Sequence, residues 1–445
     1  MLARIKVENF KSFDKEMVLN MISSTKIRSK MDHSVQVASK LKFLKHAVIY
    51  GANASGKSNL IDCISFFKDV VENGLPINCQ KLYCRNKEEN RAKDSHFEIQ
   101  IEIEGKFYAF GFSAILSERR ITGEWLYELF PNGKETLIYE READHIPVLN
   151  EVLKITQEEK SRFNTYAQDF ADNITGLFIN ELNRGKKYSD GSFFCSIVNV
   201  FKWICDKIVI ITPSSRFINF QQYYDKESLS KINSLIKTFD TGVSDVRIEE
   251  TDISELEKMI PEPVLRTMRD SLVMKKNENP NADARISGRS DKAFFSIELD
   301  KDGEVKVETI KMKHGKSICD FSFDEESDGT RRLFDLMDIL LNKYEDMVIF
   351  VDELERSLHP KLTEHFLVLF NEHHLNQKVQ LIFSTHEASI MDQKLFRRDE
   401  FWFVERDKDN NSQLYSLDRF KERYDKKLSK AYLEGRYGGI PIFMK

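Results

Sequence analysis

The chain has 445 residues, enough at roughly 100 to 200 residues per domain for two or three structural units and a substantial hydrophobic core. Hydrophobic residues make up 41% of the chain and charged residues 31%, which is typical of a folded protein and excludes global disorder. The 67 Lys and Arg residues are outweighed by 72 Asp and Glu residues, for a net charge of -5. Because no chain-wide positive field results, contact with nucleic acid requires a local basic patch.

The sequence also disfavours a membrane or secreted protein. No apolar run approaches the length of about 18 residues that crosses a bilayer. The N-terminus alternates apolar and charged side chains, as a β-strand does, and does not resemble a signal peptide. The six cysteines include no C-x-x-C pair, which favours reduced thiols over a zinc site. We therefore expect a cytoplasmic protein without a membrane partner.

The N-terminal part predicts an α/β beginning followed by an antiparallel β portion. Two strands lead to an apolar strand over 45–50, a glycine-containing loop, and a helix over 57–73 that Gly74 ends. From residue 95 apolar side chains alternate with polar ones, Gly105 turns the chain, and a second strand returns. We expect this antiparallel portion to extend to Tyr139.

The middle of the chain reads as a mostly helical insertion over about 150–280. The apolar spacing is helical from 148 to 203, and a short buried strand follows over 207–212. Residues 275–291 combine Asn, Asp, Gly, Ser and Pro with charges, which predicts a loop.

The C-terminal part returns to an α/β pattern after a strand-rich stretch over 294–324. In chain order we expect a helix over 330–342, an apolar strand over 347–351, a helix from Pro360, a strand over 379–383, and closing strands with a basic helix.

Residues 51–58, Gly-Ala-Asn-Ala-Ser-Gly-Lys-Ser, match the P-loop pattern in full and lie between an apolar strand and a helix. In such a loop backbone N–H groups surround the phosphates, and the helix N-terminus adds its positive dipole end. Lys57 reaches the β- and γ-phosphates, and the Ser58 hydroxyl is a magnesium ligand. We therefore expect ATP and Mg²⁺ as cofactors, with ATP bound by Gly51, Asn53, Ser55, Gly56, Lys57, Ser58 and Asn59.

A second motif pairs naturally with the P-loop. The apolar strand over 347–351 ends in Asp352 and Glu353, which places two carboxylates at the carboxyl edge of a parallel sheet. Asp352 is suited to hold the magnesium, and Glu353 can polarise an attacking water as general base.

Two further polar groups follow the same logic. Another apolar strand ends in Ser384-Thr385-His386, and His386 is positioned to contact the γ-phosphate; the alternative is a simple turn residue. Ser327 and Gly329 precede a helix and offer an anion-binding N-terminus; the alternative there is a simple helix cap.

In this order, the four motifs resemble the ABC-type ATPases of the SMC, DNA-repair and OLD kind. They resemble more closely a group of bacterial AAA-type, AbiEii/OLD-like ATP-binding proteins of phage-defence and abortive-infection operons. Besides residues 327–333 and 352–360, the resemblance includes the opening Val-Glu-Asn-Phe-Lys-Ser-Phe at 7–13, Arg-Arg-Asp-Glu-Phe-Trp-Phe at 397–403, and the tail at 432–441.

The resemblance implies an α/β fold: an ABC-type P-loop NTPase head with an antiparallel β subdomain and a mostly helical insertion. The implied domains are an N-terminal ATPase lobe over 1–148, the insertion over 149–292, and a C-terminal ATPase lobe over 293–445. It also implies a head-to-head homodimer, in which Ser327 and Gly329 of one subunit close over ATP held by the other.

Some family positions stay open in the sequence. Gln100 is a candidate for the glutamine that reaches the magnesium, but its alternation with Glu98 and Glu102 fits a solvated strand face equally well. Phe13 and Tyr50 are candidates for stacking on adenine.

The resemblance further implies a sensor or regulatory subunit of a phage-defence system with a separately encoded effector, such as a nuclease. Only residues 403–445 follow the strand at Trp402, too few for the Toprim nuclease of OLD proteins. The alternatives are a DNA-maintenance ATPase that clamps DNA and a toxin that uses nucleotide as a cofactor. Nucleic acid could meet the basic tail helix, unless that helix is only a solvated face, through Lys421, Arg423, Lys426, Lys427 and Lys430.

Overall fold

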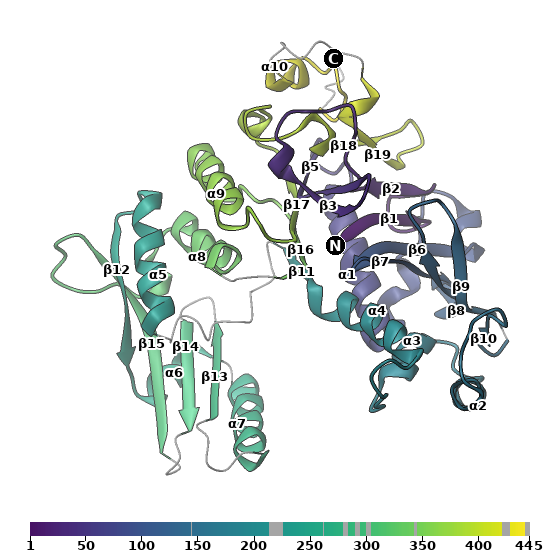
Figure 1. Cartoon of the computed structure of the whole chain (residues 1–445). Coiled ribbons are helices and arrows are strands. Elements are labelled where there is room, and N and C mark those ends of the chain that lie inside the picture. Colours follow the sequence, from purple (N-terminus) through teal and green to yellow (C-terminus); the bar gives the residue numbers. More distant parts are fainter. Residues whose placement is uncertain are drawn as a thin grey trace. The chain divides into compact units, whose positions relative to one another are not determined.

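The chain forms two compact units in the computed structural model (Figure 1). The first unit comprises Met1–Thr212, Tyr344–Leu354 and His374–Lys445, and the second Pro213–Lys343 and Glu355–His373. The described residues are 1–143, 145–212, 226–260, 262–278, 284–289, 294–299, 304–341, 345–420 and 428–440. None of the helices in these ranges is both long and apolar enough to cross a lipid bilayer.

A six-stranded sheet in the first unit carries the sequence motifs. Four strand pairs are parallel, and only the last strand, β19, is antiparallel to its neighbour β18. A parallel sheet is buried on both faces, and these strands are therefore continuous runs of apolar residues. The carboxyl ends of β5, β16 and β17 consequently meet at one edge. The strand order is β11 (Ile208–Ile211), β16 (Met347–Val351), β17 (Val379–Thr385), β5 (His46–Tyr50), β18 (Phe401–Arg406) and β19 (Ser412–Ser416).

A seven-stranded antiparallel sheet forms the rest of the β structure in this unit, together with a hairpin of β3 (Ser34–Ala38) and β4 (Leu41–Leu44). The alternation predicted from residue 95 is confirmed, with its apolar side chains in the core and a turn at Gly105. The strand order is β10 (Val148–Leu149), β9 (Glu135–Glu142), β8 (Arg120–Leu129), β7 (Lys106–Ile115), β6 (Ser95–Ile103), β1 (Leu2–Glu8) and β2 (Met17–Asn20).

The first helix, α1 (Lys57–Asn73), shares one hydrophobic core with both of these sheets. Its Phe66 ring lies 5.3 Å from Phe97 of the antiparallel sheet, and the ring of Phe67 stacks on that of Phe112 at 5.7 Å. The predicted end at Gly74 is confirmed by a left-handed φ of 79°. The other helices of this unit are α2 (Gln157–Asp169), α3 (Phe178–Asn183), α4 (Phe194–Lys207) and α10 (Leu428–Leu433).

The second unit is built on a four-stranded antiparallel sheet, β12-β15-β14-β13. Side chains of α6, α7 and the sheet form its own hydrophobic cluster. The mixed α/β architecture predicted from the sequence is confirmed across the two units. The elements are α5 (Lys226–Ile236), β12 (Val243–Glu250), α6 (Ile253–Met259), α7 (Glu262–Glu278), β13 (Ala284–Arg289), β14 (Phe294–Leu299), β15 (Val305–His314), α8 (Asp328–Leu341) and α9 (Pro360–His373).

The loop predicted over 275–291 is wrong where the structure describes this stretch. Its beginning continues α7, and β13 pairs with β14 along its whole length. The strand escapes composition-based reasoning because two of its three core-facing residues, Ala284 and Gly288, are small. A Cβ on Gly288 would lie 2.7 Å from the Phe295 ring and 3.0 Å from the Met268 methyl, so this glycine leaves room for both side chains.

The chain division differs from the three consecutive domains predicted at 148/149 and 292/293. The sheet of the second unit takes two strands from before residue 292 and two from after it, although the described part of the insertion is mostly helical, as predicted. Of the predicted basic tail helix, only Lys430 is described, in α10. Lys421, Arg423, Lys426 and Lys427 lie outside the described residues.

Candidate nucleotide site

The P-loop connects the end of β5 to the start of α1, as the sequence predicts. Gly56 adopts a left-handed φ of 114° directly before the helix. A Cβ at this position would lie 2.3 Å from Ser412 Oγ and 2.8 Å from Ser12 Oγ. The loop therefore needs glycine here for both conformation and space.

Lys57 and His386 come together at the edge of the sheet. The Lys57 side chain is buried at 5% exposure, and its Nζ donates to the carbonyl oxygens of Gly51 at 2.8 Å and Ala52 at 3.0 Å. The His386 ring nitrogen Nδ1 lies 3.4 Å from the same ammonium. Two residues 329 positions apart in sequence thus share one location, which the strand order predicts but periodicity alone does not.

Ser384 links the two carboxylate residues to this edge. Its Oγ donates to Asp352 Oδ1 at 2.5 Å and accepts from the backbone N–H of Glu353 at 2.9 Å. Asp352 is buried, whereas Glu353 is partly exposed and has a left-handed φ of 50°. One serine therefore orients a candidate metal ligand and a candidate general base. Ser384 belongs to the polar triplet at the end of its strand, but the sequence predicts no role for it.

The remaining P-loop residues differ in exposure and in direction. Asn53 and Ser58 are exposed, and Ser55 is buried. Asn59 donates from its side-chain amide to Ser12 Oγ at 2.7 Å. Ser412 Oγ lies 2.7 Å from that hydroxyl and 2.5 Å from the Ser55 carbonyl oxygen. These contacts hold the loop through Ser12, which belongs to the motif at 7–13, and through Ser412, which belongs to no motif.

The oxygen donors predicted for magnesium fit that ion chemically. Ser58 supplies a hydroxyl, and Asp352 supplies a carboxylate held in one orientation by Ser384. Mg²⁺ in nucleotide sites is bound through one or two such protein oxygens together with substrate phosphates.

Ser327 and Gly329 lie in the second unit, where each has a local structural task. Ser327 Oγ accepts from the backbone N–H of Thr330 at 3.1 Å, which caps α8. A Cβ on Gly329 would lie 2.7 Å from the Ser357 carbonyl oxygen, so this position requires glycine for close packing. Both residues thus have contacts of the kind expected from a helix cap, and their contact with ATP stays a prediction.

The three open candidates do not gain a nucleotide role in the structure. Gln100 donates to Glu98 Oε1 at 2.9 Å on the strand face opposite the core, which matches the solvated-face alternative. Phe13 and Tyr50 are each 0% exposed, so neither presents a ring face to a nucleotide.

The strand β11 lies next to β16 at the sheet edge that carries Asp352. The backbone N–H of Asp352 donates to the carbonyl oxygen of Ile211, in β11, at 2.8 Å. The residue after that strand, Thr212, is therefore a neighbour that sequence analysis missed.

A buried cluster of His33, His46 and Glu400 lies behind the P-loop strand. Among the described residues these three are a group whose ligand types could hold a metal ion. The Glu400 oxygens lie 3.0 Å from His33 Nδ1 and 3.2 Å from His46 Nδ1, and one accepts from the backbone N–H of Arg397 at 2.6 Å. Three buried contacts thus hold the Glu400 carboxylate inside the protein.

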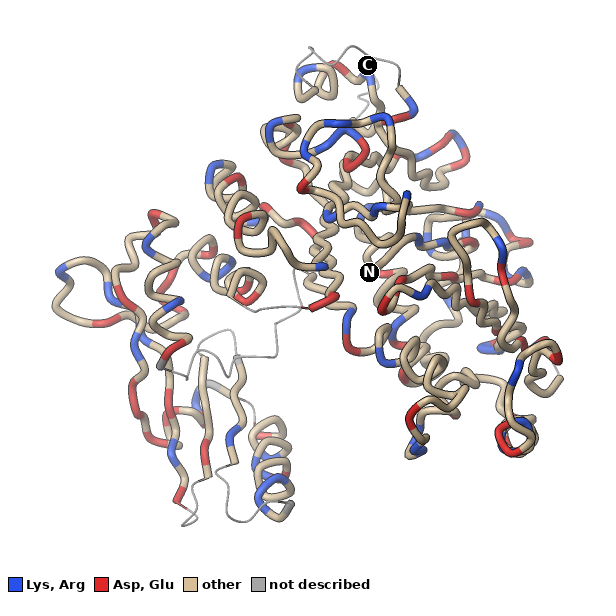
Figure 2. Tube along the Cα trace, in the orientation of Figure 1, with Lys and Arg blue, Asp and Glu red and all other residues tan. Residues whose placement is uncertain are grey.

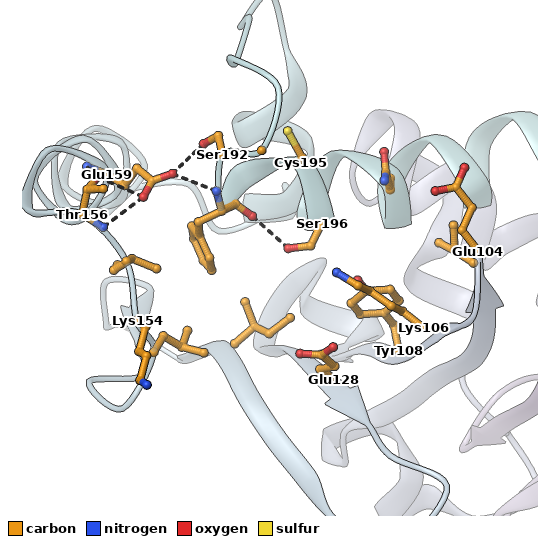
Figure 3. Close-up of a pocket in the computed structure, with 17 residues that line it drawn as sticks. Glu104, Lys106, Tyr108, Glu128, Lys154, Thr156, Glu159, Ser192, Cys195 and Ser196 are labelled. Atoms are coloured by element: carbon orange, nitrogen blue, oxygen red, sulfur yellow. Dashed lines mark hydrogen bonds between the residues drawn. The ribbon is translucent and has the colours of Figure 1, made fainter. Parts of the chain in front are cut away.

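A cavity of about 690 Å³ lies elsewhere in the first unit and includes no P-loop residue (Figure 3). Glu159 closes one wall by accepting from the backbone N–H groups of Thr156 at 3.0 Å and Phe193 at 2.8 Å. The backbone hydrogen bond from Thr156 is the main cause that holds the pKa of Glu159 at about 2. This carboxylate is a structural anion.

Comparison with protein families identifies the chain. The model of the family described as "AAA domain, putative AbiEii toxin, Type IV TA system" matches residues 47–172 and 203–392, more than half of the chain. The chain belongs to this family. Its P-loop, its Asp352–Glu353 pair and His386 all lie inside the matched ranges. The family assignment identifies the chain as an ATPase of the AAA class.

No curated protein matches the chain. Among solved structures, it is similar to an SMC head bound to the C-terminal winged-helix domain of ScpA, with 15% identity, a TM-score of 0.42, and coverage of 94% of this chain and 98% of that one. It is also similar to the SMC head domain from Thermotoga maritima, with 14% identity, a TM-score of 0.34, and coverage of 93% and 98%. For the Pyrococcus furiosus Smc head with an extended coiled coil, bound to the C-terminal domain of ScpA, the values are 14%, 0.39, 98% and 99%.

Proposed function

We propose that this protein is a magnesium-dependent ATPase that switches by ATP-driven head-to-head dimerisation. We further propose that it is the sensor or regulatory subunit of an anti-phage defence system, acting in the cytoplasm on a separate effector such as a nuclease. The observation that carries the ATPase proposal is the meeting of Lys57, His386 and the Ser384–Asp352 pair at one sheet edge.

Each side chain has a distinct task in hydrolysis. Lys57 pairs with the phosphates, where its charge-assisted hydrogen bonds replace those to Gly51 and Ala52. Glu353 takes the proton of the attacking water, and its backbone N–H is fixed by Ser384. Bound by Ser58 and Asp352, Mg²⁺ supplies positive charge that stabilises the phosphates. His386, 3.4 Å from the Lys57 ammonium, is placed to respond to loss of the γ-phosphate.

The proposed dimer and the proposed defence role are supported by different observations. Ser327 caps α8 and leaves the helix N-terminus as the anion-binding end that a second subunit would present. The defence role is supported by the family's description as putative AbiEii toxin of a type IV toxin–antitoxin system.

That same description favours a second candidate, a toxin that acts directly and uses ATP as a cofactor. Expression of the gene by itself would then arrest growth, whereas a regulatory subunit would arrest growth only with its effector.

Clamping of DNA gains less support, because Lys and Arg alternate with Asp and Glu along both units (Figure 2).

The ATP-binding step is tested by Lys57→Ala. Loss of the buried ammonium removes the charge-assisted donor to the phosphates, and we expect no ATP binding in isothermal titration with magnesium. The matched control is Lys134→Ala, at an exposed lysine in the turn between β8 and β9, which should bind as the wild type does. Wild-type affinity in Lys57→Ala would exclude the P-loop as the ATP site.

The hydrolytic step is tested by Glu353→Gln. This variant should bind ATP but turn it over about a hundredfold or more slowly, because removing a positioned general base costs about 10² to 10⁴ in rate. The control is Glu345→Gln, at an exposed glutamate shortly before β16. Turnover within a few-fold of wild type would show that Glu353 is not the base.

A further inference from the structure

The C-terminal segment, residues 428–440, contains a glycine-rich motif to which the proposed mechanism assigns no task. It begins with α10, which lies at the same end of the first unit as β18 and β19 (Figure 1). Three glycines with left-handed backbone follow, Gly435, Gly438 and Gly439, with φ of 78°, 70° and 67°. Left-handed conformations at three positions in five residues fix the path of the backbone closely.

That path brings the segment against the first residue of the P-loop. Gly439 is buried, and a Cβ at this position would lie 3.4 Å from the Cα of Gly51. Gly51 itself has little room, because a Cβ on it would lie 2.5 Å from the Val404 carbonyl oxygen of β18. The Gly51 carbonyl accepts from Lys57 Nζ at 2.8 Å, so the position of this glycine bears directly on that of the catalytic ammonium.

Aromatic side chains hold the segment in place. The Tyr432 ring lies 5.4 Å from that of Tyr50, the last residue of β5, and its hydroxyl donates to the Gly439 carbonyl oxygen at 3.1 Å. The Tyr415 hydroxyl of β19 lies 2.7 Å from the carbonyl oxygen of Tyr437, which is fully buried. The segment is thus anchored to the strand that leads into the P-loop and to the edge strand of the same sheet.

We propose that residues 435–440 are a positioning element of the nucleotide site, which holds Gly51 and Lys57 in the arrangement that binds ATP. This proposal rests on the proposed function, because the segment acts through the P-loop. Packing of the segment and binding of ATP then favour each other. By linkage, each must strengthen the other by the same factor.

The direct test compares two glycines with similar backbones. Gly438→Ala and Gly133→Ala both place alanine at a positive φ, 70° and 85°. A Cβ at 438 would overlap the Tyr415 hydroxyl that anchors Tyr437 and would lie 2.5 Å from Glu405 Oε2, whereas a Cβ at 133 meets no atom within 4 Å. Because this anchor would be displaced, we expect Gly438→Ala to raise the Kd of magnesium-ATP about tenfold or more, and to raise KM by a larger factor than it lowers kcat. Gly133→Ala should stay within about twofold of wild type in both.

Two further measurements keep the test decisive if Gly438→Ala does not fold. Tyr432→Phe keeps the ring against Tyr50 but loses the hydroxyl donor to Gly439, and it should weaken ATP binding about fivefold. In the wild type, magnesium-ATP should slow hydrogen exchange of the 435–440 amides. Unchanged ATP affinity in the folded variants, or exchange that ATP does not alter, would overturn the proposal. A wild type that binds no ATP would instead contradict the proposed function.

Discussion

Ser384 shows how much of this site depends on a residue without chemistry of its own. It contacts the Asp352 carboxylate through its hydrogen and the Glu353 backbone through its oxygen. Alanine would remove both hydrogen bonds. The residue is therefore a positioning residue. It is distinguishable from Lys57 because its loss should lower kcat and not ATP binding, and from Glu353 because the fall in kcat should be smaller.

Ser384→Ala should lower kcat for ATP hydrolysis about tenfold to a hundredfold and leave the Kd of ATP within a few-fold, because misplacement of a catalytic group costs rate more than binding. Steady-state kinetics with titration calorimetry measure the two effects separately. Ser389→Ala, at an exposed serine on the following turn, is the control. If kcat is unchanged, the hydroxyl does not orient the base.

At the scale of elements, the buried cluster behind the P-loop joins three segments that are distant in sequence. His33 comes from a 3₁₀ turn (Met31–His33), His46 from β5, and Glu400 from another 3₁₀ turn (Arg398–Glu400). Arg397 adds two hydrogen bonds to Asp399, at 2.9 and 2.8 Å. These contacts link β5, the strand that leads into the P-loop, to the start of β18.

The cluster predicts loss of stability in acid. Burial by itself raises the pKa of Glu400, but the hydrogen bonds from His33 and His46 outweigh it and hold the pKa at about 2. Burial lowers the pKa of His46. Both folded pKa values lie below the unfolded ones, so the stabilisation is present at neutral pH. It is lost first as the pH falls below about 6.5, through His46, and further from about 4.5 toward 2, through Glu400.

Urea unfolding as a function of pH measures this effect. The free energy of unfolding should fall across both ranges, and Glu400→Gln should remove the part of the fall below about pH 4.5. Parallel curves for the variant and the wild type in that range would show that Glu400 does not contribute.

Helices and strands with one dominant pattern of apolar residues could be predicted from the sequence, whereas those with mixed patterns could not. The helix over 57–73 and the strand over 347–351 lie where the sequence predicts them, since apolar runs and a terminal glycine mark them. The hairpin of β3 and β4 was missed, because most of its residues are only half-buried and show no clean alternation. The contacts of Ser12 and Ser412 with the P-loop could not be predicted, because they form only through tertiary structure, although Ser12 lies in the motif at 7–13.

At the scale of the whole molecule, the motifs are divided between the two units. The P-loop, Asp352, Glu353 and His386 belong to the first unit, and Ser327 belongs to the second. Sequence order placed the motifs correctly along the chain, but it suggested consecutive domains. The sheet of the second unit instead draws strands from both sides of the predicted boundary at 292/293, because strand pairing can join segments far apart in sequence.

The proposed dimer predicts complementation between two inactive variants. Ser327→Arg should bind ATP as a monomer but fail to associate, because a bulky cation fills the place of the other subunit's γ-phosphate. In a heterodimer with Lys57→Ala, the Lys57→Ala chain supplies an intact Ser327 to the intact P-loop of its partner. One working site is rebuilt, so ATPase activity should return on mixing, to about half of the two-site rate if the sites are independent.

Light scattering with an activity assay on the mixture checks this prediction. Each variant by itself should be inactive, and mixing each with itself is the control. A mixture that forms heterodimers but stays inactive would show that Ser327 acts within its own chain, or that the two sites cannot work singly.

The chain passes from the first unit to the second just after β16, between Leu354 and Glu355, and this has a mechanical consequence. Leu354 is the last residue of the first unit, and its backbone N–H is held by the Ser384 carbonyl oxygen at 3.1 Å. Only this residue separates Glu353 from the beginning of the second unit at Glu355. Peptide units barely stretch, so a pull on the second unit is transmitted along the backbone to Leu354 and to the left-handed turn at Glu353. A ligand that displaces the second unit would then move the backbone of Glu353, the proposed general base, and would change the rate of the proposed hydrolysis.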